Sequence, residues 1–532
     1  MLKKMFGKKH GVKERLTCKP IPVSLDGGSH TSGKVCGLFR ICPHHRAARP
    51  PITENLLTPT FFMVGREKNK DCAIIFCINS FFYSSILQFL SEREEDIVGL
   101  RKFSFNFGRS TQEVELPEER ISSIIEGRPV PAVDVEQAAL EAMRHPIGCK
   151  PLQEMFRKGD KVCLVIADVT RSWNRSSEYV IHVVNELNLA GVPDEDMYIV
   201  FAQGTHREQT PEENVRVVGE EVARRIRMYQ HHCRNKDELT CVGTTRFGTK
   251  VMLNKRVVEA DKIVIIDGIT AHLFAGYGGG RKLLLPGVAG WDTIQENHCH
   301  ALADHFGDGI NPKTRNGVLH DNPVNYDMLE AMDMVRPTFL VHSIINNEGE
   351  ICNIVAGDPY QAWLEGTRIC HDNQAVSFKE RADVTFACAG GYPKDVSLYQ
   401  GCKCYDPADV TTKPGGIIIA IMEASDLYEP PEYLGSFKYD SEQEMEKDLR
   451  KNFSIPFFVA FNLFCMTHRY TIYLVTKKEN FEAIRKTNQI PCATVAEAWE
   501  KAQAQLEREG KKDYTLNLIP HCGGVIAEEP GK

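Results

Sequence analysis

The sequence is poor in the features that mark several classes of protein. Its 64 Lys and Arg residues are outnumbered by 71 Asp and Glu residues, whereas a nucleic-acid-binding protein usually carries a basic face. Its 18 cysteines in 532 residues are too sparse for a disulfide scaffold, and no secretory signal precedes them. We therefore expect reduced thiols, a cytoplasmic location and no nucleic-acid partner.

Long apolar runs are also scarce. Residues 73–90 (AIIFCINSFFYSSILQFL) have about the length of a membrane span, but Asn79, Gln88 and several serines make a membrane helix unfavourable there. We expect no membrane partner. No sustained period of two or 3.6 residues appears before Ala73, and we predict that residues 1–101 form a poorly structured N-terminal extension.

From residue 102 onward, apolar runs alternate with helix-period segments. The runs at 161–168, 197–204 and 262–267 are typical of buried parallel strands, with helices at 177–189 and from 210. Further strands are predicted at 382–389, 416–422 and 470–476, and a helix at 495–507. This alternation predicts two α/β domains with largely parallel sheets, at 102–375 and 376–532. Since ligands bind at the carboxyl ends of parallel strands, we expect the active site in the interdomain cleft.

Polar residues follow each of the first three predicted strands. Asp168 to Arg171 follow the first, His206 the second and His272 the third. The arginine fork suits a carboxylate or phosphate, and histidine suits acid–base chemistry. One histidine would mean little in a chain with 18, but three consecutive strand ends with Arg, His and His favour a functional site.

A glycine-rich run at 276–280 precedes Arg281 and Lys282. A Walker loop needs Gly directly before the Lys and Ser or Thr after it, and the dinucleotide fingerprint needs Gly where Arg281 stands. Both phosphate-loop interpretations therefore fail. The run still allows close approach of a bulky ligand. Lys282 is either a nucleophilic amine of lowered pKa or a solvated lysine that closes a turn.

His298 and His300 lie in the densest histidine cluster of the chain. Because imidazole is a common metal ligand, one alternative is a zinc-dependent hydrolase with these two residues as ligands. That site would need a third ligand and a general base, and the chain has no HExxH pattern there. In the second predicted domain, Gln400 and Lys403 would share one helix face and could hold a substrate oxygen.

Taken together, these motifs resemble those of the nickel-dependent lactate racemase family. The resemblance extends from about residue 102 to the C-terminal region. The motifs occur in the family's order and at compatible separations. They are Asp168-x-Thr170-Arg171, Gly204-Thr205-His206-Arg207, His272-x-Phe274-Ala275-Gly276, Gly278-Gly279-Gly280-Arg281-Lys282, Asn297-His298, Tyr392-Pro393-Lys394, and Gln400 with Lys403.

The resemblance implies a racemase or epimerase of a small 2-hydroxy acid, lactate or a related acid. It implies a nickel-pincer nucleotide, a pyridinium-3,5-bisthiocarboxylate mononucleotide that holds nickel, and cofactor-synthesis enzymes as partners. Lys282 would bind this cofactor covalently, and His298 would ligate the nickel. His206 and His272 would alternate as acid and base in a reversible hydride transfer. The cofactor would also be lined by Asp168, Val169, Thr170 and Arg171, and the substrate by Arg171, Tyr399, Gln400 and Lys403.

Overall fold

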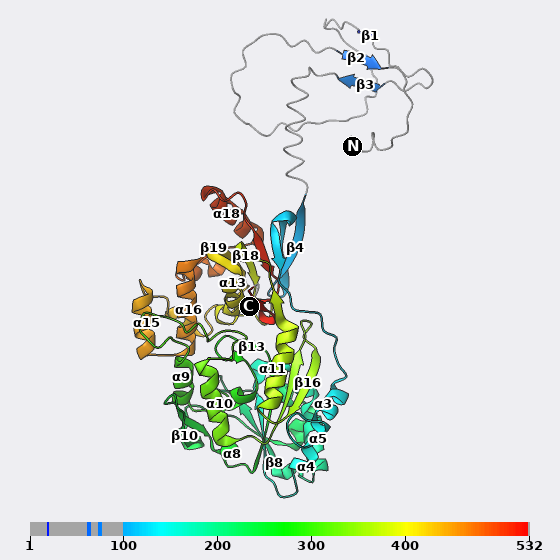
Figure 1. The fold of residues 1–532 in the computed structure, drawn as a ribbon, viewed down its shortest axis with the longest axis vertical. Helices are drawn as coiled ribbons and strands as arrows, with labels where there is room; N and C mark the ends of the chain where they lie inside the picture. The colour runs from blue at the N-terminus through cyan, green and yellow to red at the C-terminus, as the bar shows by residue number, and fades with distance from the viewer. Residues whose placement is uncertain (1–18, 21–60, 65–72, 77–98, 530–532) are drawn as a thin grey trace, which may run out of the picture. The chain divides into compact units, whose positions relative to one another are not determined.

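The computed structural model describes residues 19–20, 61–64, 73–76 and 99–529 (Figure 1). Contacts divide the chain into two units, Met1–Gly99 and Leu100–Lys532. In the first unit, β1 (Lys19–Pro20), β2 (Phe61–Val64) and β3 (Ala73–Phe76) form an antiparallel sheet. At the end of the predicted extension, Leu100 and Arg101 lie in β4 (Leu100–Phe107) rather than in a poorly structured segment. The remaining residues of the extension before Gly99 lie outside the described residues. Within the described ranges, no helix is long and apolar enough to cross a membrane.

The second unit contains two six-stranded sheets. The first sheet has the order β16-β15-β12-β7-β8-β9, and all its strands are parallel except β16. The predicted strands at 161–168, 197–204 and 262–267 are confirmed as β7, β8 and β12. The strands of this sheet are β7 (Val162–Ala167), β8 (Met197–Ala202), β9 (Arg227–Tyr229), β12 (Lys262–Ile269), β15 (Phe339–Ile345) and β16 (Ile351–Gly357).

Helices cover both faces of the first sheet because its strands are apolar on both sides. In β7, Leu164 and Ile166 pack with α3, α5, α6 and α7, whereas Cys163 and Val165 pack with α8, α10 and α11. Such two-sided burial is typical of a doubly wound parallel sheet. The helices of this half are α3 (Val135–Arg144), α4 (Leu152–Met155), α5 (Val180–Leu189), α6 (Pro211–Val218), α7 (Glu220–Arg225), α8 (Lys255–Val258), α9 (Trp291–Cys299), α10 (Pro323–Val335) and α11 (Gln361–Gln374).

The second sheet has the order β21-β20-β19-β18-β22-β6 and is parallel throughout. The predicted strands at 382–389, 416–422 and 470–476 are confirmed as β18 (Ala382–Cys388), β19 (Thr412–Ile421) and β20 (Thr471–Val475). The others are β6 (Ile121–Ile124), β21 (Ile490–Cys492) and β22 (Leu516–Ile519). The helices of this half are α12 (Leu398–Gly401), α13 (Tyr405–Thr411), α14 (Pro431–Gly435), α15 (Glu442–Lys451), α16 (Ile455–Arg469), α17 (Phe481–Arg485) and α18 (Val495–Arg508).

Smaller elements complete the second unit. β4 (Leu100–Phe107) and β5 (Ser110–Pro117) form a hairpin, as do β10 (Leu239–Thr244) and β11 (Lys250–Asn254), and β13 (Ala271–His272) and β14 (Gly276–Tyr277). β17 (Ala375–Ser377) pairs with β23 (Ile526–Glu528).

The start of the second unit packs with the second sheet, although residues 102–124 are predicted to belong to the first domain. Phe105 and Leu116 of the β4–β5 hairpin pack against one face of the second sheet, and β6 pairs with β22. On the other face, one hydrophobic core joins both halves and contains Phe274 and Phe458. Because this core is shared, contacts do not divide the chain near residue 375, and that boundary stays a prediction.

Candidate active site

The predicted polar motifs lie beyond the carboxyl ends of neighbouring parallel strands. Asp168 directly follows β7 and begins a short 3-10 helix, η2 (Val169–Asn174), which contains Arg171. His206 follows β8, and His272 follows β12 in β13. Since β12, β7 and β8 are adjacent in the sheet, the three motifs meet at one edge.

Asp168 and His206 form a hydrogen-bonded pair. The Asp168 side chain is buried; its Oδ2 lies 2.7 Å from Nδ1 of His206, and its Oδ1 accepts a hydrogen bond from Thr170 (2.7 Å). Burial raises the pKa of Asp168, but the hydrogen bond and charge of His206 and the charge of Arg171 outweigh it, so that the pKa lies below its usual value. An ionised Asp168 draws Nδ1–H of His206 toward itself and leaves Nε2 as a proton acceptor.

In His272, unlike in His206, Nδ1 is a hydrogen-bond acceptor. Its Nδ1 accepts hydrogen bonds from the backbone N–H groups of Phe274 (3.1 Å) and Ala275 (3.3 Å). Burial, followed by the charges of Lys282 and Arg171, holds the pKa of His272 well below its usual value. The neutral ring therefore carries its proton on Nε2 and is a hydrogen-bond donor there.

Lys282 lies half-buried in a 3-10 helix, η6 (Gly280–Leu283), among several cations. Burial lowers the pKa of Lys282 well below that of an ordinary lysine, and the charges of Arg171, Arg281 and Lys403 lower it further. The charge of Asp267 acts in the opposite direction. A lowered pKa increases the unprotonated, nucleophilic fraction of the Lys282 amine at a given pH, which favours the first of the two interpretations of Lys282.

The glycine-rich loop uses its glycines for close packing. The N–H groups of Gly278 and Gly280 are bonded within the protein, to a backbone carbonyl (2.8 Å) and to Nε2 of His342 (2.6 Å). The φ angles of Gly279 and Gly280 are +70° and +55°, and a Cβ at these positions would lie 2.8 Å from His342 and 2.7 Å from Trp363. Glycine is needed here because larger residues would collide with buried rings. This agrees with the exclusion of both phosphate-loop interpretations.

His298 lies in α9 and is 2% exposed. Its Nδ1 donates a hydrogen bond to the carbonyl of Ile294 (3.0 Å), which leaves Nε2 as a potential metal ligand. Burial, and then the charge of Lys282, lower the pKa of His298 to about 3, so the ring is neutral, as metal ligation requires. One such nitrogen fits a metal that an organic cofactor already holds by other atoms.

The paired zinc ligands of the alternative interpretation do not come together. Nε2 of His300 lies 3.3 Å from Oγ1 of Thr249. The same Thr249 hydroxyl donates a hydrogen bond to Oδ2 of the buried Asp327. Residues two apart on a helix point in different directions, so His298 and His300 do not face one ion. In the part of the chain that the structure describes, no three His, Cys, Asp or Glu side chains are grouped to hold a metal.

Gln400 and Lys403 follow β18 of the second sheet. Gln400 lies in α12, and Lys403 lies in the 3-10 turn that comes after this helix. The Lys403 ammonium donates a hydrogen bond to Oε1 of Gln400 (3.0 Å), which confirms that the two share one face. Burial lowers the pKa of Lys403 to about 8, and the charge of Arg171 adds to this effect. Tyr399, from the same helix, has a pKa raised by burial. The site therefore combines side chains from the carboxyl ends of both sheets.

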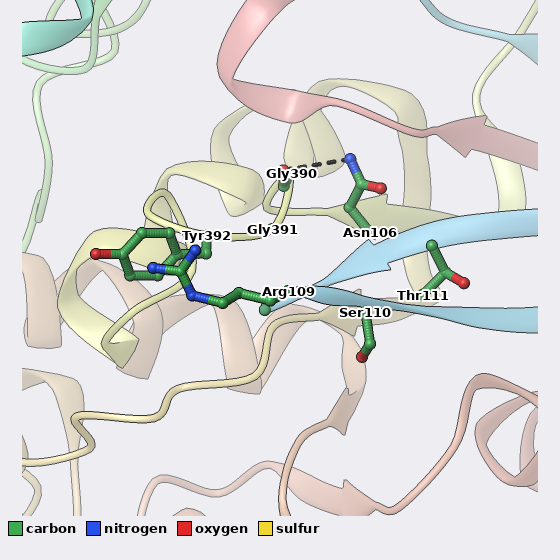
Figure 2. A pocket seen from close by; sticks show the side chains of 8 residues that line it. Asn106, Arg109, Ser110, Thr111, Gly390, Gly391 and Tyr392 are labelled. Carbon is green, nitrogen blue, oxygen red and sulfur yellow. Dashed lines mark hydrogen bonds between the residues drawn. The ribbon is translucent and has the colours of Figure 1, made fainter.

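The β4–β5 hairpin holds the loop that leads from β18 to Gln400. The Gly108 N–H donates to Oδ2 of Asp395 (2.7 Å), and the Tyr392 N–H donates to the Gly108 carbonyl (2.8 Å). Figure 2 shows the Arg109 guanidinium across the ring of Tyr392, 3.8 Å from its centroid. A cavity of about 530 Å³ between this hairpin and loop, and another of about 1050 Å³ beside α11, are lined by none of the predicted site residues.

Two charged residues near the site are not among those predicted from the sequence. Asp267, in β12, is 6% exposed and accepts a hydrogen bond from Asn174 (3.0 Å); burial raises its pKa to about 6. The strand-end rule could have found Asp267, because it closes a predicted strand. Arg281 is fully buried. It stands in the glycine-rich motif, but the sequence gives no signal of its burial, because arginine is ordinarily exposed.

Comparisons with known proteins find relatives over most of the chain. Models of the lactate racemase N-terminal and C-terminal domains match residues 107–308 and 378–527. The lactate racemase of Thermoanaerobacterium thermosaccharolyticum is 29% identical over 439 residues, which are 80% of this chain and 98% of the relative. That of Lactiplantibacillus plantarum is 28% identical over 409 residues, 74% of this chain and 91% of the relative.

Solved structures share the fold. The lactate racemase apoprotein from Thermoanaerobacterium thermosaccharolyticum superposes with a TM-score of 0.73 at 29% identity, over 81% of this chain and all of that one. A protein from Thermotoga maritima has a TM-score of 0.55 at 16% identity, over 76% of this chain and all of that one, and this similarity extends to the fold alone.

Proposed function

The chain belongs to the lactate racemase family, a family of isomerases, and we propose that it racemises or epimerises a small 2-hydroxy acid, lactate or a related acid. The observation that carries this proposal is that His206 and His272 follow β8 and β12, on either side of β7, and that Lys282 is close enough to His272 for its charge to lower the pKa of that histidine. Lys403 of the second sheet is close enough for its charge to lower the pKa of both His272 and Lys282.

The residues of this site fit a nickel-pincer nucleotide. Lys282 would bind it covalently, His298 would give Nε2 to the nickel, and the segment from Asp168 to Arg171 would line it. When bound, this group supplies a reversible hydride acceptor. Loading of the protein would depend on cofactor-synthesis enzymes as partners.

His206 and His272 are proposed to move the hydroxyl proton of the substrate. Nε2 of His206 is the acceptor, because Asp168 holds its Nδ1–H. Nε2–H of His272 is the donor, because backbone amides occupy its Nδ1. A cycle that inverts a carbinol centre needs one group that takes a proton and one that supplies it on the other side. Substrate of the opposite configuration would exchange the two roles.

Arg171, Tyr399, Gln400 and Lys403 are proposed to hold the substrate carboxylate and hydroxyl. Arg171 offers a planar fork for a carboxylate, and the Lys403 ammonium, bonded to Gln400, adds a second cation. Two cations in a partly buried site select an anionic substrate and stabilise negative charge on its oxygens.

Intact-protein mass spectrometry tests the cofactor assignment. Protein produced together with the cofactor-synthesis enzymes should carry an adduct that is absent from Lys282→Ala. A wild-type protein without an adduct would contradict the assignment, and bound zinc without nickel would favour the hydrolase.

A racemisation screen over a panel of 2-hydroxy acids tests the reaction. His206→Ala and His272→Ala should each abolish conversion in both directions, since every inversion uses both groups. Full activity in either variant would overturn its role. The cytoplasmic location stays a prediction.

A further inference from the structure

Arg281 is a charged residue that the proposed reaction does not use, yet it occupies the centre of the glycine-rich loop. Its side chain is 0% exposed. It donates hydrogen bonds to the carbonyls of Ala275 (2.7 Å), Tyr277 (2.9 Å) and Gly279 (3.4 Å) and to Oδ1 of Asn325 (2.9 Å). One guanidinium thus gathers three carbonyls from five consecutive residues of the loop.

The partners of Arg281 are all uncharged. No carboxylate forms an ion pair with it within residues 99–529, and its guanidinium lies 3.9 Å from the centroid of the Trp363 ring. Burial lowers the pKa of Arg281 well below its usual value. Its hydrogen bonds to four oxygen atoms offset the cost of burying the cation, and arginine keeps its proton in proteins. The loop therefore surrounds a fixed positive charge that no neighbouring acid cancels.

Arg281 and Lys282 are adjacent in η6, so their side chains leave the turn in different directions. Arg281 enters the core beneath the loop, where Trp363 also donates a hydrogen bond to the Gly278 carbonyl (2.9 Å). Lys282 stays half-buried on the side of the site residues. The conformation that buries Arg281 is thus the one that presents Lys282.

We propose that Arg281 is the positioning residue for Lys282, because its buried guanidinium holds the glycine-rich loop in one conformation and fixes a positive charge on the neighbouring residue of η6. The proposal rests on the assignment of Lys282 as the attachment residue, but it makes a claim about the cofactor-free protein. A lysine that must couple to an acyl group needs both a fixed position and a free electron pair.

The charges around Lys282 agree with this role. Arg171, Arg281 and Lys403 disfavour its ammonium form, and Asp267 favours it. The two neighbouring histidines are neutral, since the pKa values of His272 and His298 are lowered. The positive charge of Arg281 is the nearest of these in sequence and is fixed by its hydrogen bonds.

Competitive acylation of the cofactor-free protein tests the proposal. Limiting acetic anhydride is applied between pH 7 and 10.5, and modification of Lys282 is measured by peptide mass spectrometry against Lys486, whose side chain is 70% exposed. In the wild type, Lys282 should be modified with a lower pH midpoint than Lys486. Arg281→Met should raise that midpoint. At pH values below both midpoints, it should reduce the relative modification of Lys282 by about tenfold, the change that corresponds to a shift of one unit.

Two further variants separate the effect of the Arg281 charge on Lys282 from the effect of loop stability. Asn325→Asp keeps Arg281 but places a carboxylate next to its guanidinium and neutralises its charge, so the pH midpoint of Lys282 modification should also rise. If Arg281→Met does not fold, this variant tests the proposal in its place. Trp363→Phe removes the bond to Gly278 but keeps the charge, so it should lower the melting temperature with little change in the midpoint.

Equal Lys282 midpoints in the wild type, Arg281→Met and Asn325→Asp would overturn the proposal and leave Arg281 a purely structural residue. The readout does not involve the cofactor. A missing adduct in the loaded protein would contradict the proposed function and leave this result standing.

Discussion

Replacing Asp168 by Asn is expected to disable His206 while leaving the site otherwise intact. Asn is isosteric with Asp and can keep the bond from Thr170, but its amide N–H can face Nδ1 of His206. The imidazole would then accept at Nδ1 and carry its proton on Nε2, which converts the acceptor into a donor. General-base catalysis contributes about 10²–10⁴-fold. We expect kcat to fall by that factor, equivalent to about 3–5 kcal/mol of activation free energy.

The loaded enzyme is assayed by following each enantiomer separately at several substrate concentrations. KM should change little, because Arg171 and Lys403 remain. For a racemase, kcat/KM should fall equally for both enantiomers, because their equilibrium constant is one. Glu238→Gln is a matched control, since Glu238 pairs with Nδ1 of His232 (2.9 Å) outside the site. Retention of activity within about threefold in Asp168→Asn would refute the general-base argument for His206.

Three further predictions concern stability. Burial lowers the pKa of His342 to about 4, which is below its value in the unfolded chain. The unfolded state therefore binds the extra proton, and the free energy of unfolding falls as the pH drops from 7 to 5. Urea unfolding should show that His342→Gln lessens this fall by about 2 kcal/mol. Phe458 packs 4.9 Å from the Phe274 ring across the shared core, so Phe458→Ala should cost about 3–5 kcal/mol by the same measurement, and Phe458→Leu less. Thr210 forms a capping box with Glu213 at the start of α6, so Thr210→Ala should cost about 1 kcal/mol; an unchanged midpoint would contradict the cap.

Most predicted strands match the structure because each is a buried apolar run. Such a run can be recognised from its own residues, without knowing which strand it pairs with. β7 and β8 lie within one or two residues of their predicted bounds. The helix predicted at 177–189 begins later, as α5, because Tyr179 has a non-helical φ of −125° and its hydroxyl donates to the Asp267 carbonyl (2.8 Å). A tertiary hydrogen bond therefore displaced a boundary that local periodicity had placed earlier.

By itself, the sequence determined the alternation of strands and helices and the polar residues at the strand ends, because both depend on residue type and spacing. It also singled out Lys282 and His298, whose roles the family resemblance implies. Only the tertiary structure decided that the β4–β5 hairpin packs against the second sheet, that His300 lies apart from His298, and that the two halves share one core. These depend on contacts between segments distant in the chain, which periodicity does not record. The same is true of the charge that Arg281 holds beneath Lys282.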